Sequence, residues 1–352
     1  MKRLFSLVLF LAAVAGAALF VLTAVKNNAK ADFRVAFLDA SVDNRRAVFE
    51  EFIDKLGAQK ILEMLEEKYP LCHDEAHGLG RVVFSRTRDI AESIEVCRDG
   101  CTGACFHGVL MEAFGDDKQQ ITNDERQGDE DRHIRLSEVR AEAAELCESS
   151  QVLDFHSKGK CVHGVGHAFS YLSGYKIPEA LEACKVFGDK RLEFYCAGGV
   201  FMEYEGVYGS RDLVSESLHY PCDKYGSRYP AACYPHKVPH LVKKLDSKEN
   251  LIEECLKLDG FYKTGCFHGL GYQYNLEVQA NPARVKLICP GGSLIDQKAC
   301  LYGAIIKIAE INPERGPEVC GFFEGEKKEF CEETFRQGPY SLERDFSLFF
   351  EL

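Results

Sequence analysis

The cysteines of this 352-residue chain recur in pairs at a nearly constant spacing. From position 147 onward, the two members of a pair lie 14, 12, 11, 11, 11 and 11 residues apart, and successive pairs begin at intervals of 37, 38, 33, 34 and 31 residues. A period of this length is typical of proteins built from repeated helical hairpins. The six pairs are Cys147–Cys161, Cys184–Cys196, Cys222–Cys233, Cys255–Cys266, Cys289–Cys300 and Cys320–Cys331.

The sequence around each pair predicts two helices joined by a loop. The first cysteine ends a short segment of helix formers, as in residues 178–184, and a turn with glycine follows, as at Gly188, Gly226 and Gly260. The second cysteine opens an apolar segment, such as Cys-Val-His-Gly-Val-Gly-His at 161–167. We therefore expect an all-α fold of seven or eight disulfide-stapled helical hairpins, arranged as an open solenoid or a closed α/α ring.

The first third of the chain shows the same pattern less regularly. Cys105-Phe-His-Gly matches the second-helix motif, with Cys97 as its expected partner, whereas His77-Gly-Leu-Gly lacks the preceding cysteine. Cys72 and Cys101 are then left to pair with each other. The expected helical repeat domain spans residues 43–352, with capping helices at 43–70 and an acidic, solvated loop insertion at about 115–132.

Disulfides explain this cysteine pattern better than metal thiolates. A disulfide that closes a loop of about 12 residues stabilises a fold by roughly 3 kcal/mol in the chain-entropy model. Zinc thiolate sites usually show tight Cys-x₂₋₄-Cys spacing, which none of the six regular pairs has. Cys97, Cys101 and Cys105 are closer together and are the one plausible exception. Paired cysteines imply an oxidising compartment, so we expect the bulk of the chain on the extracytoplasmic side.

The N-terminal segment predicts a membrane anchor. A flank at 1–3 carries two basic residues, and the next 22 residues, 4–25, are uncharged. As a helix they would extend about 33 Å, enough for a bilayer core of roughly 30 Å. A small-residue cleavage site at 29–31 keeps open a signal peptide and a secreted protein. Residues 26–42 are read as a linker.

The acidic balance of the chain limits its partners. Its formal net charge is −12, so its surface would repel nucleic acid, and we expect no nucleic-acid partner. The expected partners are the membrane, through the N-terminal helix, and a protein or small ligand.

Histidine recurs at one position of the repeat, immediately before glycine. His163 is followed four residues later by His167, and residues four apart share one face of a helix. Pairs at the same spacing are His73 with His77 and His236 with His240. Imidazoles placed in this way can bind zinc, copper or iron. The histidines at the shared position are His77, His107, His163 and His268.

A structural role for these histidines is the main alternative. Residues that recur in every unit of a solenoid usually serve the packing between units. The glycines after each histidine would cost helix stability, about 1 kcal/mol each, unless neighbouring helices approach closely there. We expect the shared positions near helix N-termini, where the helix dipole would favour neutral imidazole.

Three functional hypotheses follow. The first is a protein that binds a metal ion or metal-bearing ligand through His163 and His167, and then through His77, His107 and His268. The second is a scaffold for a protein or peptide partner, with structural histidines.

The third hypothesis is a metal-dependent hydrolase or oxidoreductase with Glu112 or Glu203 as general base. These two glutamates are equivalent residues of different repeats and could also form a glycosidase carboxylate pair. Arg81 is the only cation at its repeat position and would suit an anionic ligand, or it pairs with a carboxylate such as Glu112.

Overall fold

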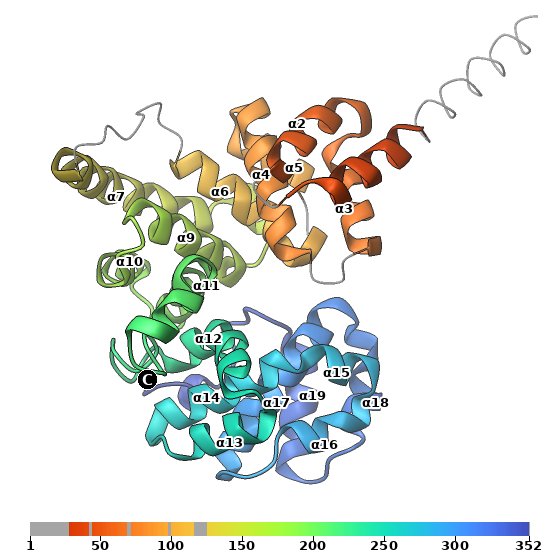
Figure 1. Ribbon diagram of the computed structural model, residues 1–352, viewed down its shortest axis with the longest axis vertical. Coiled ribbons are helices and arrows are strands. Elements are labelled where there is room, and N and C mark those ends of the chain that lie inside the picture. The colour runs from red at the N-terminus through yellow and green to blue at the C-terminus, as the bar shows by residue number, and fades with distance from the viewer. Residues whose placement is uncertain (1–27, 42–43, 69–71, 98–99, 116–124, 352) are drawn as a thin grey trace, which may run out of the picture. The chain divides into compact units, whose positions relative to one another are not determined.

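Figure 1 shows the computed structural model, which describes residues 28–41, 44–68, 72–97, 100–115 and 125–351. These ranges contain helices and turns and no strand, which confirms the predicted all-α class. The chain divides into two compact units, Met1–Val109 and Leu110–Leu352.

The predicted membrane span at residues 4–25 lies outside the described part of the chain. Among the helices that are described, none is both long and apolar enough to cross a bilayer.

The helices of the first unit follow its apolar periodicity. The capping helices expected at 43–70 are present as α2 and α3, whereas the expected linker at 26–42 contains a helix at 28–39. That helix forms because Phe33 packs against Phe49 and Phe52 of α2, with ring centroids 6.3 and 5.6 Å apart. The other elements are α2 (Arg45–Leu56), α3 (Ala58–Lys68), α4 (His73–Thr87), α5 (Ile90–Cys97), a 3₁₀ turn (Gly100–Gly103) and α6 (Ala104–Gly115), which crosses the boundary between the units.

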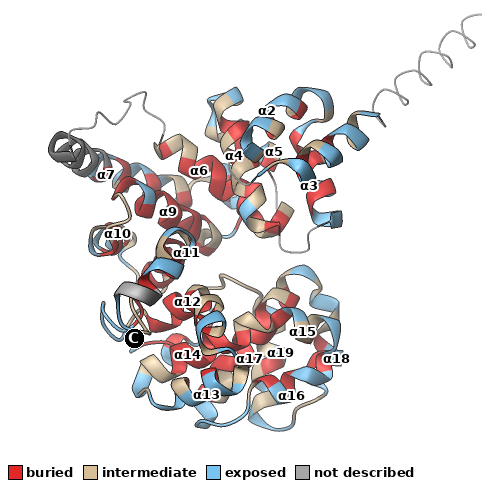
Figure 2. Ribbon diagram, viewed as in Figure 1, coloured by how far each residue is buried: buried red, intermediate tan, exposed pale blue. Residues whose placement is uncertain are grey.

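The second unit continues the alternation of short and long helices. Its long helices α9, α14 and α17 are buried over most of their length, as the red segments in Figure 2 show. The loop expected at 115–132 is partly helical, because α7 begins at Glu125. Residues 116–124 of that expected loop lie outside the described part. The helices are α7 (Glu125–Glu148), α8 (Ser150–Leu153), α9 (Lys158–Leu172), α10 (Ile177–Cys184), α11 (Lys190–Ser215), α12 (Pro230–Leu245), α13 (Lys248–Leu256), α14 (Gly260–Gln273), α15 (Asn275–Ala280), α16 (Val285–Ile288), α17 (Leu294–Ile311), α18 (Gly316–Cys320) and α19 (Glu326–Gln337).

Eight disulfides pair all sixteen cysteines, which confirms the six pairs predicted from spacing and the two expected pairs of the first third, Cys97–Cys105 and Cys72–Cys101. The Cα atoms of the bonded residues lie between 5.3 and 5.7 Å apart, inside the usual range for a disulfide. The bonds Cys97–Cys105 and Cys72–Cys101 exclude a thiolate metal site at this cluster. Eight disulfides indicate an oxidising, extracytoplasmic or secreted environment.

Two details of the predicted hairpins differ in the structure. The segment before Cys222 is a series of turns and not a helix, because Pro221 disfavours helical backbone at the residue before it. The long helices also begin three to six residues before their cysteine, as α9 does at Lys158. His163 and His268 therefore lie beyond the first turn of their helices, whereas His77 and His107 lie close to the N-termini of α4 and α6, as expected.

The glycines of the repeat motif lie where two long helices touch. A Cβ built on Gly166 of α9 would be 2.0 Å from the carbonyl oxygen of Cys196, and one on Gly199 of α11 would be 2.0 Å from that of His163. Real Cβ atoms do not approach an oxygen so closely, so the two backbones are in direct contact. Reciprocal pairs with Cβ-to-oxygen distances of 1.9 to 2.2 Å recur where α4 meets α6 (Gly80 and Gly108) and where α14 meets α17 (Gly271 and Gly303).

These crossings predict opposite effects for two substitutions in one helix. Gly199→Ala should lower the free energy of unfolding by about 1–3 kcal/mol, because its methyl group would overlap the backbone of α9. Gly206→Ala, on an exposed part of α11 with no atom within 4 Å of the added Cβ, should raise it by about 0.5–1 kcal/mol. Chemical denaturation followed by circular dichroism measures both, and equal effects would contradict the crossing.

Candidate metal centre

Three histidines of the first unit face one another. His73 and His77 lie one turn apart at the start of α4, and the crossing of α4 with α6 brings in His107. The ring centroid of His73 lies 4.6 Å from that of His77 and 5.4 Å from that of His107. The ring centroids of His77 and His107 lie 5.7 Å apart. One nitrogen of each ring lies within 4.8 Å of the others. We call these three residues the imidazole triad.

The triad has dimensions that suit a metal ion. Three donors spaced at most 4.8 Å apart surround a point no more than about 2.8 Å from each, compared with about 2.0–2.1 Å for a zinc–nitrogen bond. Small ring rotations close that difference. His107 is fully buried, and His73 is oriented by Thr102, whose hydroxyl oxygen lies 2.9 Å from its Nδ1. An oriented imidazole of this kind is a common feature of metal sites.

In the second unit, His163 and His167 face each other through their Nε2 atoms, which lie 3.3 Å apart. The Nδ1 of His163 lies 3.2 Å from the carbonyl oxygen of Tyr195, which can only accept a hydrogen bond. The Nδ1 of His167 lies 3.1 Å from Oε2 of Glu203. Both Nδ1 atoms therefore carry the proton when the rings are neutral, and both Nε2 atoms present a lone pair. We call these two residues the histidine pair.

Two lone pairs at this distance require a cation between them, which is either a proton or a metal ion. Burial, followed by the neighbouring charges of His167 and His236, holds the pKa of His163 well below its ordinary value, which disfavours a proton on that ring. Two metal–nitrogen bonds of about 2.05 Å that meet at a tetrahedral angle place their nitrogens about 3.3 Å apart. The spacing of the pair matches that figure.

The other predicted histidines are not brought together. His268 donates from Nδ1 to the carbonyl oxygen of Ala231 at 2.7 Å and packs against Tyr302 and Phe349. His236 and His240, one turn apart on α12, have different surroundings. Burial, with smaller contributions from His167 and His268, lowers the pKa of His236 to about 3.

His240 belongs to a separate buried group on α11 and α12. Its Nε2 lies 3.8 Å from Oε2 of Glu205, which lies 3.7 Å from Nζ of Lys237. The absence of a side chain at Gly209 makes room for this group, because a Cβ there would be 2.2 Å from the Glu205 carboxylate. Burial raises the pKa of Glu205 to about 8, even though Lys237 works against that shift.

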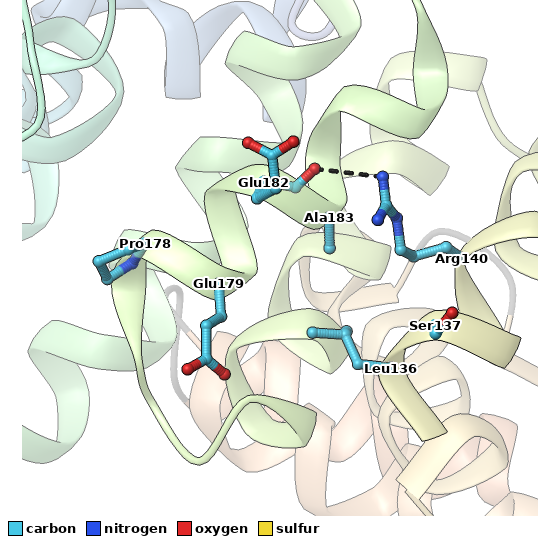
Figure 3. A pocket seen from close by; sticks show the side chains of 7 residues that line it. All are labelled: Leu136, Ser137, Arg140, Pro178, Glu179, Glu182 and Ala183. Atoms are coloured by element: carbon cyan, nitrogen blue, oxygen red, sulfur yellow. Dashed lines mark hydrogen bonds between the residues drawn. The ribbon is translucent and has the colours of Figure 1, made fainter. Parts of the chain in front are cut away.

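The residues predicted for acid–base or anion-binding roles are Glu203, Glu112 and Arg81. Glu203 accepts a hydrogen bond from His167, so it orients that ring. Glu112 on α6 and Arg81 on α4 are each half-buried at the helix position that the repeat alignment predicts. A surface hollow between α7 and α10, shown in Figure 3, contains none of the histidines. It is bordered by Arg140, whose guanidinium donates to the carbonyl oxygen of Glu182 at 3.4 Å.

The alignment of the repeats does not identify His73 as a site residue. It lies outside the shared position before glycine, so the alignment of repeats gives it no weight. Its spacing of four residues from His77 was the signal that points to it.

Comparison of the chain with known protein families, with curated proteins and with solved structures finds no match. The candidate centre therefore rests on the geometry of the chain itself.

The buried state of His268 predicts how stability depends on pH. Burial lowers its folded-state pKa to about 4, against 6.5 in the unfolded chain. Below pH 6.5 the unfolded chain takes up a proton that the folded chain does not, so this residue removes stability as pH falls towards 4, up to an amount on the order of 3 kcal/mol.

NMR of the histidine ring carbons tests this expectation. The His268 signal, assigned with His268→Gln, should remain that of neutral imidazole down to about pH 5. In denaturant the same signal should titrate near pH 6.5. A midpoint near 6.5 in the folded chain would show that the ring is not buried as described.

Proposed function

We propose that this chain is a transition-metal-binding protein of an oxidising compartment, which holds its ion with histidine side chains. The imidazole triad carries this proposal, because three ring nitrogens lie within 4.8 Å of one another around a common centre. Three histidines with one open position form the ligand set of many zinc sites that also bind water or substrate.

The histidine pair supports a second binding point in the other unit. Its nitrogen spacing of 3.3 Å suits two ligands of one tetrahedral ion. Glu203 takes the part of the carboxylate that commonly orients a metal-bound histidine. Imidazole donors favour zinc, copper or iron over magnesium or calcium, so the ion is proposed to be one of the first three.

The location of the protein is part of the same proposal. The apolar segment at 4–25 is proposed to anchor the chain in a membrane, with the disulfide-bonded units on the extracytoplasmic side. The repeated helix crossings support a stacked, solenoid-like arrangement of hairpins within each unit. An open coordination position would also permit metal-activated water chemistry, the basis of a hydrolase or oxidoreductase.

A peptide-binding scaffold is the second candidate function. One observation favours it: the segment after α19 places Phe346, Phe349 and Phe350 against Phe194 of α11, with ring centroids 5.4 to 5.8 Å apart. The long helices of the second unit therefore accept an irregular, aromatic stretch of chain. Under this function the histidines would serve packing, as His268 does through Ala231.

Metal analysis of the full chain tests the main proposal. Protein made in an oxidising compartment, stripped with chelator and reloaded with zinc or copper, should retain at least one ion per chain by mass spectrometry. His77→Ala combined with His107→Ala should lose the ion of the triad. His163→Ala combined with His167→Ala should lose the ion of the pair, and Glu203→Gln should weaken that ion roughly tenfold or more.

His268→Ala is the matched control, since it removes a histidine of the same repeat position that belongs to neither group. It should retain the wild-type metal content. Absence of metal from the folded wild-type chain after reloading would rule out the proposal and leave the scaffold. The same would follow if the triad and pair variants bound as much metal as the control.

A further inference from the structure

The segment after α19 places the side chain of Arg344 in the interior of the second unit. It is held to α11 by two hydrogen bonds, from Tyr195 Oη to the carbonyl oxygen of Ser341 at 2.7 Å and from the Arg191 guanidinium to that of Leu342 at 2.8 Å. Two residues further on, Arg344 is only 8% exposed. This burial is unusual, since arginine is rarely buried unless it is paired.

Among the residues that the structure describes, no carboxylate forms an ion pair with Arg344. Its guanidinium carbon lies 4.1 Å above the ring of Tyr302, one of its terminal nitrogens donates to the carbonyl oxygen of Gly338 at 2.6 Å, and its buried Nε has no acceptor. The charge of Arg344 contributes to lowering the pKa of Glu333, but that side chain is exposed and already forms an ion pair with Arg336. Arg344 also makes a side-chain hydrogen bond with Tyr195, so a ring face, a carbonyl and a phenol surround the guanidinium, and none of them carries a negative charge.

A second buried cation acts on the same tyrosine. Lys307 of α17 lies 3.0 Å from Oε2 of Glu310, and Lys160 of α9 lies 3.6 Å from Oε1 of that glutamate. One carboxylate thus faces two lysines, and the three side chains are only 9% to 13% exposed. Burial raises the pKa of Tyr302, and Arg344 and then Lys307 oppose that shift.

The groups around these cations add no negative charge at neutral pH. His268, whose low pKa Arg344 helps to depress, is neutral, and the phenol of Tyr302 stays protonated because burial raises its pKa. A buried guanidinium without a counter-charge costs several kcal/mol, and a guanidinium binds carboxylate or phosphate oxygens through two parallel hydrogen bonds. The side chain of Lys307 keeps 13% of its surface exposed, so it can be reached from solvent.

We propose that the second unit binds a small, multiply charged oxyanion of the phosphate or dicarboxylate type beside Tyr302, between Arg344 and Lys307. The hydroxyl groups of Tyr302 and Tyr340 would donate further hydrogen bonds to it. None of these four side chains belongs to the imidazole triad or the histidine pair, and Tyr340 packs against His163 of the pair with ring centroids 5.3 Å apart. The site thus goes beyond the proposed metal-binding function, and its test uses chelator-treated protein.

Thermal unfolding of the full, chelator-treated chain at pH 7 tests the site, with inorganic phosphate and malonate as probes and sodium chloride at equal ionic strength as reference. A specific anion should raise Tm saturably, by about 3–5 °C at ten times its dissociation constant. Calorimetric titration of the same sample should return that constant. A response to phosphate alone assigns a phosphate-type ligand, and a response to malonate alone assigns a dicarboxylate.

Two variants and a matched control locate the effect. Arg344→Gln and Lys307→Met should each abolish the anion-specific rise in Tm, whereas Arg336→Gln, which removes an exposed arginine of α19, should keep it. If either variant does not fold, the other variant and the wild-type calorimetry still decide. No heat and no rise beyond chloride in the wild type, or a rise that persists in a folded site variant, would overturn the proposal.

Discussion

The architecture depends on direct backbone contact between neighbouring long helices. Where α9 meets α11, each helix presents a glycine to a carbonyl oxygen of the other, and the same reciprocal contact joins α4 to α6 and α14 to α17. The carbonyl oxygens involved belong to the second cysteine of one repeat and to the histidine of its neighbour. Packing at this distance fixes the rotation of both helices. It therefore also fixes where the histidine side chains lie.

The disulfides and the polar interior complement these crossings. In each of the six regular pairs, the bond joins the segment before a loop to the helix that follows the loop, so these hairpins are covalently closed. The interior of the second unit also carries a neutral histidine, tyrosines and the guanidinium of Arg344, polar groups whose burial is costly. Ionisable side chains whose pKa values are shifted by burial cluster at binding and catalytic sites.

The pattern of cysteines predicted the fold class and the six regular disulfides, because partners 11 to 14 residues apart at a nearly fixed period leave few alternatives. The other two followed only from a motif match at Cys105 and from the two cysteines left over, Cys72 and Cys101. Local boundaries were less predictable: α7 begins inside the expected loop, and the segment before Cys222 is not a helix. His73 was identifiable only through its spacing from His77. The position of Arg344 could not be predicted, because it depends on contacts between Arg191 and Leu342, 151 residues apart along the chain.

X-ray absorption at the zinc K-edge, on the full chain loaded with one equivalent of zinc, tests histidine coordination most directly. We expect a first shell of nitrogen or oxygen atoms near about 2.0 Å, with the outer-shell multiple scattering of at least two imidazole rings. That outer-shell signal should fall in the variants of the imidazole triad or of the histidine pair and persist in His268→Ala. A first shell of oxygen atoms without imidazole scattering would contradict a histidine metal centre.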